Sequence, residues 1–148
     1  MAMSICLVPK SGLERKATNM THPRVGVVGA GRVGAVLAAR LQRAGFELVA
    51  ISGQSPASLL RIQTLLVDVP VLSPAEVAKS AEIVILAVPD DALADVAGEL
   101  AERVGPGRLV AHTSGRHGLA VLAPLAAAGA RTIALHPAMT FTGTEIDL

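Results

Sequence analysis

The feature that most constrains the fold is a set of three glycines, Gly29, Gly31 and Gly34, placed between an apolar run at 24–28 and a segment of helical period. Gly29 would let the chain turn tightly after a strand, and Gly34 would let the following helix pack close to a sheet. Gly31 would let the backbone approach a diphosphate, which the free amides of a helix N-terminus attract. A GxGxxG pattern alone is weak, and it becomes specific between a strand and a helix.

Beyond the glycines, apolar runs alternate with helical segments, and Gly, Pro, Ser or Asp separates them. This alternation is the sequence form of repeated βαβ units. The expected strands are residues 24–28, 47–51, 69–72, 82–88, 108–112 and 131–135. Six such strands predict an α/β fold with a doubly wound parallel sheet, three-layer α/β/α, which resembles the Rossmann type with strand order 3-2-1-4-5-6.

Local signals mark where several helices begin. Ser55 followed by Pro56 fits a helix start through about residue 66, because a serine can accept a free amide and a proline suits the first helical position. Ser73 and Glu76 match a capping box. The Pro-Asp-Asp run at 89–91 is expected to end the fourth strand and to cap a helix that continues to about residue 104.

Composition narrows the classes of function. The 148 residues are 51% apolar and include two Phe, no Trp and no Tyr, so small aliphatic side chains must fill the core. The net charge is +1 and acids and bases are interspersed, which argues against a nucleic-acid partner. No apolar run approaches the roughly 20 residues that cross a bilayer, so no membrane partner is expected.

Other features bear on domains and location. Residues 1–23 show no sustained period and are expected to form a flexible N-terminal tail, followed by one domain at 24–148. Cys6 is the only cysteine, so no internal disulfide can form, which favours a cytoplasmic protein. The four histidines lack ligand spacing and an accompanying acidic cluster, so no metal site is expected.

The end of the second strand bears on which dinucleotide would bind. Domains that prefer NAD place Asp or Glu there to bind the ribose hydroxyls, whereas this chain has Ser52-Gly53-Gln54-Ser55. A carboxylate would repel a 2′-phosphate, while small hydroxyl residues accept it and Arg32 or Arg61 could supply positive charge. The sequence therefore favours NADP, with NAD possible. Either arginine could instead lie on a solvated helix face.

Loops after the fourth, fifth and sixth strands should meet at one edge of the sheet, where ligands of doubly wound folds bind. Residues 87–89 would lie along the nicotinamide ribose. Ser114 could orient a substrate oxygen and His136 could exchange a proton, so both are candidate catalytic residues for hydride transfer. Either strand-end histidine, His112 or His136, could instead be a hydrogen-bonded structural residue. The expected cofactor-binding residues are Gly29, Ala30, Gly31, Arg32, Val33, Gly34, Ser52, Gly53, Gln54, Ser55, Ala87, Val88 and Pro89.

These motifs resemble a family that pairs a Rossmann-like NAD(P)-binding N-terminal domain with a helical C-terminal domain of unknown function. The family is similar to pyrroline-5-carboxylate reductases and to 6-phosphogluconate and hydroxyacid dehydrogenases. The residues that carry the resemblance are 27–34, 87–90, 112–115 and 135–141. Prephenate and arogenate dehydrogenases look similar in placing a substrate-contacting Ser and a functional His where this chain has Ser114 and His136.

The resemblance implies an oxidoreductase that transfers a hydride to or from a small carbonyl, alcohol or imine substrate. In the family the helical domain closes the substrate pocket and builds a homodimer, and this sequence ends where that domain would begin, so the 148-residue fragment is expected to be poorly active. Relatives often carry Arg near the end of strand two, where this chain has Gln54. The alternative is a noncatalytic nucleotide-binding or sensing module.

Overall fold

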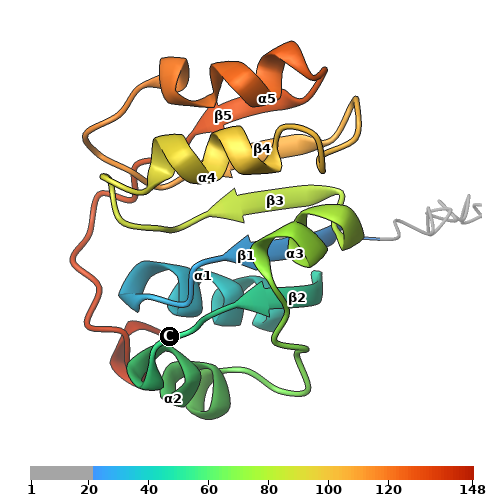
Figure 1. Cartoon of the computed structure of the whole chain (residues 1–148). Coiled ribbons are helices and arrows are strands. Elements are labelled where there is room, and N and C mark those ends of the chain that lie inside the picture. The colour runs from blue at the N-terminus through green and yellow to red at the C-terminus, as the bar shows by residue number, and fades with distance from the viewer. Residues whose placement is uncertain (1–21) are drawn as a thin grey trace, which may run out of the picture.

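The computed structural model describes residues 22–148, so the expected tail lies almost wholly outside the described residues. Figure 1 shows one parallel sheet with helices around it. The strands are β1 (Arg24–Val28), β2 (Glu47–Ser52), β3 (Ile83–Leu86), β4 (Leu109–His112) and β5 (Arg131–Ala134). The helices are α1 (Arg32–Arg43), α2 (Pro56–Leu65), α3 (Pro74–Ser80), α4 (Leu93–Leu100) and α5 (Ala123–Ala127), with 3₁₀ turns η1 (Leu119–Leu122) and η2 (Glu145–Asp147).

The strand order is β2-β1-β3-β4-β5, and each neighbouring pair is parallel. The doubly wound α/β fold is confirmed, but the prediction of six strands is wrong by one. Residues 69–72 form a single bridge, Val71 to Ile51, at the outer side of β2. Ile51 donates to Pro70 and accepts from Leu72, and Pro70 has no N–H with which to extend the ladder.

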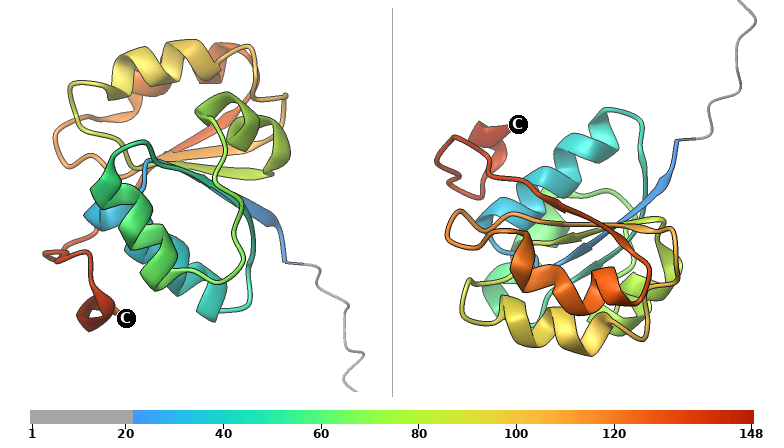
Figure 2. Two further views of the ribbon diagram at one scale, coloured as in Figure 1. Left: turned by 60° about the horizontal axis from the view of Figure 1, so that its bottom comes forward. Right: turned by 90° about the horizontal axis from the view of Figure 1, so that it is seen from above.

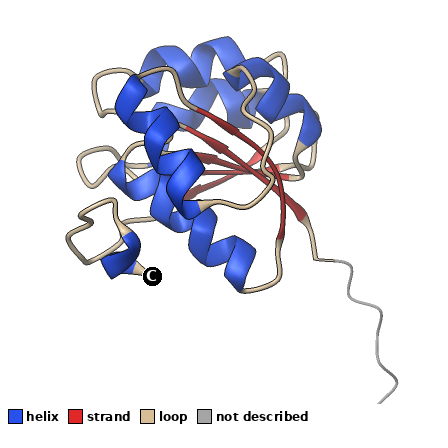
Figure 3. Ribbon diagram, turned by 90° about the horizontal axis from the view of Figure 1, so that it is seen from below, coloured by secondary structure: helices blue, strands red, loops and turns tan. Residues whose placement is uncertain are grey.

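Helices cover both faces of the sheet, as the left view of Figure 2 and Figure 3 show. Helices α1 and α2 pack on one face against Val25, Val27 and Ile51, while α3, α4 and α5 pack on the other against Val28 and Leu86. Successive residues of β1 alternate between the layers, as the two-residue period of a strand requires. Because the buried side chains are mostly Ala, Val and Leu, the helices lie close to the strands and fix the sheet edge at which loops converge.

The helix starts follow the local sequence in two cases. Ser55 accepts the N–H of Ser58 at 3.1 Å, as expected of the residue that caps α2. Ser73 accepts the N–H of Glu76, whose carboxylate accepts the N–H and hydroxyl of Ser73 at 2.9 and 2.6 Å. These bonds lower the pKa of the Glu76 carboxyl. The capping box is therefore confirmed, and it holds the first turn of α3.

The expected cap of the next helix is wrong. The chain turns at 90–92, where Ala92 donates to the carbonyl of Pro89, and α4 begins at Leu93 without a side-chain cap. This helix ends at Leu100 and continues as turns, short of the expected residue 104. The last expected helix, 119–128, is a 3₁₀ turn joined to the five residues of α5, because Pro124 has no N–H to donate within a continuous helix.

The segment after β5 returns to the other end of the sheet. It runs across the strand ends and packs beside α1 and α2, as the red chain in Figure 1 shows. Phe141 is buried in the core layer of these helices, and Arg40 of α1 donates to the main-chain oxygen of Asp147. We call residues 141–148 the C-terminal strap. No period or motif in the sequence predicted this strap.

Candidate cofactor-binding site

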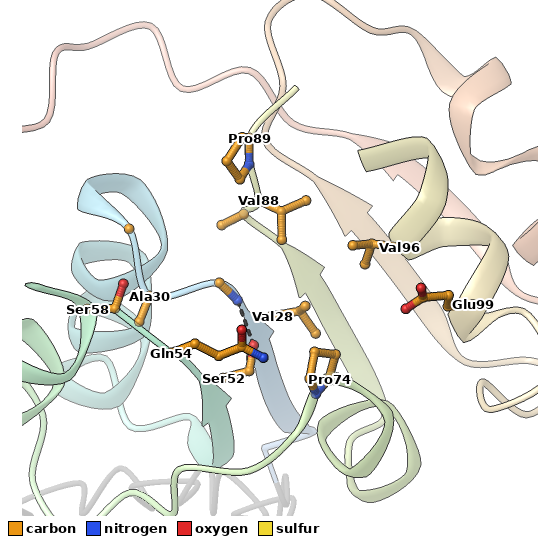
Figure 4. A pocket seen from close by; sticks show the side chains of 14 residues that line it. Val28, Ala30, Ser52, Gln54, Ser58, Pro74, Val88, Pro89, Val96 and Glu99 are labelled. Carbon is orange, nitrogen blue, oxygen red and sulfur yellow. Dashed lines mark hydrogen bonds between the residues drawn. The ribbon is translucent and has the colours of Figure 1, made fainter. Parts of the chain in front are cut away.

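A cleft of about 440 Å³ opens where β1, β2 and β3 end. Its floor and one wall come from the glycine loop and the end of β2, and its other wall comes from residues 87–89, α3 and α4 (Figure 4). The loop between β1 and α1 supplies Gly29, Ala30 and Gly31, and the end of β2 with the segment after it supplies Ser52, Gly53 and Gln54. The structure therefore brings nine of the thirteen expected cofactor-binding residues to one cavity.

The three glycines of the loop have distinct environments. Gly29 has φ of +100°, and a Cβ there would lie 2.6 Å from the carbonyl oxygen of Ala87. A Cβ on Gly34 would overlap the carbonyl oxygen of Gly29, so the first turn of α1 lies directly against the loop. Gly31 is different, because no atom lies within 4 Å of the position its Cβ would take. It also precedes α1 without a side-chain cap, which leaves helix amides facing open space.

Ser52 borders the cleft, but its hydroxyl is bonded to the glycine loop. Its hydroxyl accepts the N–H of Gly29 at 2.9 Å, and its side chain is buried. The hydroxyl expected to receive a 2′-phosphate thus ties the end of β2 to the glycine loop. Gln54 is exposed, and its amide extends into the cleft in Figure 4.

Arg32 and Arg61 come together at the C-terminal strap. Gly143 lies against both, since a Cβ there would be 2.9 Å from Cγ of Arg32 and 3.0 Å from Nε of Arg61. Gly143 has φ of +78°, and its N–H donates to the Asp147 carboxylate at 2.7 Å. The strap therefore places two guanidinium side chains beside the start of α1. Gly143 and the two threonines that flank it suit a turn, but their sequence does not predict which helices that turn contacts.

A second cavity, of about 510 Å³, continues the cleft toward the ends of β3 and β4. It shares Gly31 and residues 87–89 with the first cavity and adds Arg32, Val33, Thr113 and Ser114. Ser114 is buried, and its hydroxyl oxygen accepts the N–H groups of Arg116 and His117 at 3.1 Å each. Ser114 therefore organises the turn after β4 and retains a hydroxyl proton to donate.

His136 lies over the same turn. A Cβ on Gly115 would be 2.7 Å from Nδ1 of His136, so only a glycine leaves room for the imidazole where it lies. His136 is exposed, and its ring lies against the residue that follows Ser114, the other candidate catalytic residue. The structure thus brings the two candidates to one loop from two neighbouring strand ends.

His112 is buried in the core and lines neither of the two cavities. The side chain is fully buried, and Nδ1 accepts the N–H of Ser114 at 3.2 Å. Its Nε2 is buried without a hydrogen-bond partner among the described residues. His117 is only partly exposed, and its ring contacts the carbonyl oxygen of Asp90 at 2.9 Å, which links the loops after β3 and β4.

Comparison with known families identifies the fold directly. Residues 11–137 match the model of the Rossmann-like domain. The chain belongs to the Rossmann-like domain family. Among curated proteins no sequence matches it.

Solved structures with the same fold include three oxidoreductases. A candidate NADP oxidoreductase from Bacteroides fragilis is 24% identical over 83% of this chain and 46% of its own, with a TM-score of 0.69. A 3-hydroxyisobutyrate dehydrogenase from Mycobacterium tuberculosis is 20% identical over 76% and 40%, with a TM-score of 0.65. Prephenate dehydrogenase from Aquifex aeolicus, solved with NAD⁺, is 23% identical over 81% and 43%, with a TM-score of 0.63. The Rossmann-like domain spans less than half the length of each.

Across residues 22–148, none of the helices has the length and apolar character that crossing a membrane requires. In the same part of the chain, His, Cys, Asp and Glu side chains do not gather in threes in a way that could hold a metal ion.

Proposed function

We propose that this chain binds NADP and forms the cofactor-binding half of an oxidoreductase. The observation that carries the proposal is the open position at Gly31, where an uncapped helix start faces the cleft. A diphosphate there would accept hydrogen bonds from main-chain amides and lie at the positive end of α1. The nicotinamide of NADP supplies hydride transfer, and the protein supplies binding and orientation.

NADP rather than NAD is favoured by charge. The end of β2 carries no carboxylate, and Arg32 and Arg61 lie together at Gly143 beside the start of α1. Two guanidinium groups suit a 2′-phosphate, which accepts paired hydrogen bonds. Because the hydroxyl of Ser52 is already bonded to Gly29, the phosphate would bind mainly to the arginines, with Gln54 and Ser55 nearby.

The second cavity is the proposed place for the substrate. Ser114 would donate its hydroxyl proton to a carbonyl, alcohol or imine group, and His136 would exchange a proton with solvent. Ser114 lines the second cavity together with residues 87–89, which also line the first, and His136 lies against Gly115 at the border of the second cavity. The small-molecule substrate would thus sit beside the cofactor at the edge of β3, β4 and β5.

The primary test is a titration with NADPH and NADH. Gly31→Asp would place a carboxylate where the diphosphate is expected, and we expect it to abolish binding, with at least about a 100-fold loss from charge repulsion. The φ of −71° and the empty space at Gly31 let Asp fit, so the variant should fold. Gly118→Asp is the matched control, since Gly118 also has open space and lies outside both cavities. Unchanged affinity in Gly31→Asp would refute the proposal.

A noncatalytic nucleotide-binding module is the second candidate. The observation that favours it is the hydroxyl of Ser114, which already accepts two main-chain amides as a structural residue would. The test is an assay of NADPH oxidation with a panel of carbonyls and imines. Slow oxidation with any of them would support the oxidoreductase and contradict the noncatalytic module.

We further propose that the complete protein is a cytoplasmic homodimer. The apolar side chains of Ile133 and Leu135, two residues apart at the outer strand, are 40% and 43% exposed and could support such a contact. Light scattering of the longest natural chain would test the dimer.

A further inference from the structure

One ionisable side chain lines the cleft on the wall opposite the glycine loop. Among the fourteen residues that surround this cavity, Glu99 alone carries a titratable group. It projects from α4 one turn after Val96, and both side chains are directed toward the cleft in Figure 4. Glu99 therefore places the one carboxylate of a mostly apolar cavity where it can contact a bound ligand.

Charge decides which part of a dinucleotide would face this wall. The diphosphate and the 2′-phosphate are anions, and they would be drawn to the start of α1 and to Arg32 and Arg61. A carboxylate repels both, so the part of the ligand beside Glu99 should be uncharged. The base is the uncharged part at that end of the molecule.

The neighbours of Glu99 suit a flat ring. Val28, Val88 and Val96 present apolar surface, and Pro74 approaches from the start of α3. Glu99 also borders a shallow cavity with Arg103, but these two side chains do not form an ion pair in the structure. The oxygens of its carboxylate can therefore accept hydrogen bonds from a ligand.

We infer that Glu99 recognises the exocyclic amino group of the cofactor's base and makes the site select adenine over hypoxanthine. The inference rests on the proposed nucleotide binding. Adenine presents an N–H₂ donor where hypoxanthine presents a carbonyl oxygen, so a carboxylate attracts the first and repels the second. Gln54 faces the cleft from the opposite wall, but an amide both donates and accepts and so discriminates less between the bases.

The experiment compares NADPH with its hypoxanthine analogue in fluorescence titrations of the chain. The unsubstituted protein should bind NADPH at least about 10-fold more tightly, the effect of one charge-assisted hydrogen bond. Glu99→Gln should bring the two affinities within about 3-fold of each other, because an amide can donate to the hypoxanthine carbonyl. Glu102→Gln is the matched control, since Glu102 is exposed beyond the end of the same helix and lies outside the cleft. It should keep the 10-fold preference.

The outcomes separate the two proposals. If the unsubstituted chain binds neither dinucleotide, nucleotide binding fails and the role of Glu99 falls with it. If both bind and their ratio is the same with and without Glu99→Gln, the role of Glu99 is wrong while the proposed function stands. A ratio that changes equally in Glu102→Gln would also overturn it, because the effect would then be one of overall charge.

Discussion

The two ends of the cleft are built in different ways. At the glycine loop, the main chain of Gly34 packs directly against the carbonyl of Gly29, and the buried hydroxyl of Ser52 accepts the Gly29 N–H. At the other end, His136 is exposed and only rests on Gly115, itself an exposed turn residue. The difference teaches that the proposed anion site is fixed by the fold before any ligand arrives, whereas the proposed substrate site includes an exposed side chain, His136, that can rotate.

The largest expected contrast comes from the same substitution at both ends. Gly34→Ala would drive a Cβ into the Gly29 carbonyl, and neither backbone segment can move without opening the loop. We expect a loss of about 3 kcal/mol or more in the free energy of unfolding. Gly115→Ala meets only the exposed imidazole of His136, which can rotate away, so its cost should stay within about 1 kcal/mol. Urea unfolding of both variants measures the contrast.

A third glycine provides the control for that comparison. Gly98 lies on the exposed side of α4, and no atom is within 4 Å of its Cβ position. Gly98→Ala should stabilise the domain by about 0.5–1 kcal/mol through helix propensity alone. Equal losses in Gly34→Ala and Gly115→Ala would show that the two ends are equally adaptable and would remove the comparison.

The parts that could be predicted from sequence are those fixed by neighbouring residues. The glycine loop follows from a strand, three glycines and a helix in succession, and the caps at Ser55 and Ser73 depend only on the next three residues. The prediction of a strand at 69–72 was wrong for a reason that the local sequence contains: Pro70 has no N–H with which to continue a β-ladder. The order of the five observed strands could also be predicted, because right-handed crossover connections leave few possible orders for a parallel sheet.

The parts that could not be predicted depend on residues far apart in the chain. Ser52 was expected to face a ligand, and its bond to Gly29 appears only when β1 and β2 pair. Arg32 and Arg61 meet at Gly143, which lies 82 residues beyond Arg61. No periodic pattern around Gly143 predicts that it contacts them. Tertiary contacts of this kind leave no pattern in a single sequence.

A smaller effect is expected where a side chain, rather than the backbone, holds the glycine loop. Ser52→Ala removes the acceptor of the Gly29 N–H in a buried setting, which should cost about 1–3 kcal/mol and speed hydrogen exchange at Gly29. Ser55→Ala is the comparison, because this exposed helix cap should cost about 1 kcal/mol without affecting that amide. If exchange at Gly29 is unchanged in Ser52→Ala, the loop is fixed by its glycines alone.

The smallest effect concerns the strap that holds the two arginines, and acid should reveal it. Burial disfavours the Asp147 carboxylate, but hydrogen bonds from Gly143 and Thr142 outweigh burial and lower its pKa below the ordinary 3.8. A lowered pKa means that the carboxylate stabilises the fold above pH 3.8 and that this contribution is lost as pH falls through the lower, folded value. Asp147→Asn should therefore melt below the unsubstituted protein at neutral pH, and the two should converge in strong acid. Glu145→Gln, on the exposed side of the same turn, should show no such convergence. A gap in Tm between Asp147→Asn and the unsubstituted protein that stays constant from pH 7 to about pH 2 would mean that the ionised carboxylate does not hold the strap, and Gly143 would then be kept against Arg32 and Arg61 by packing alone.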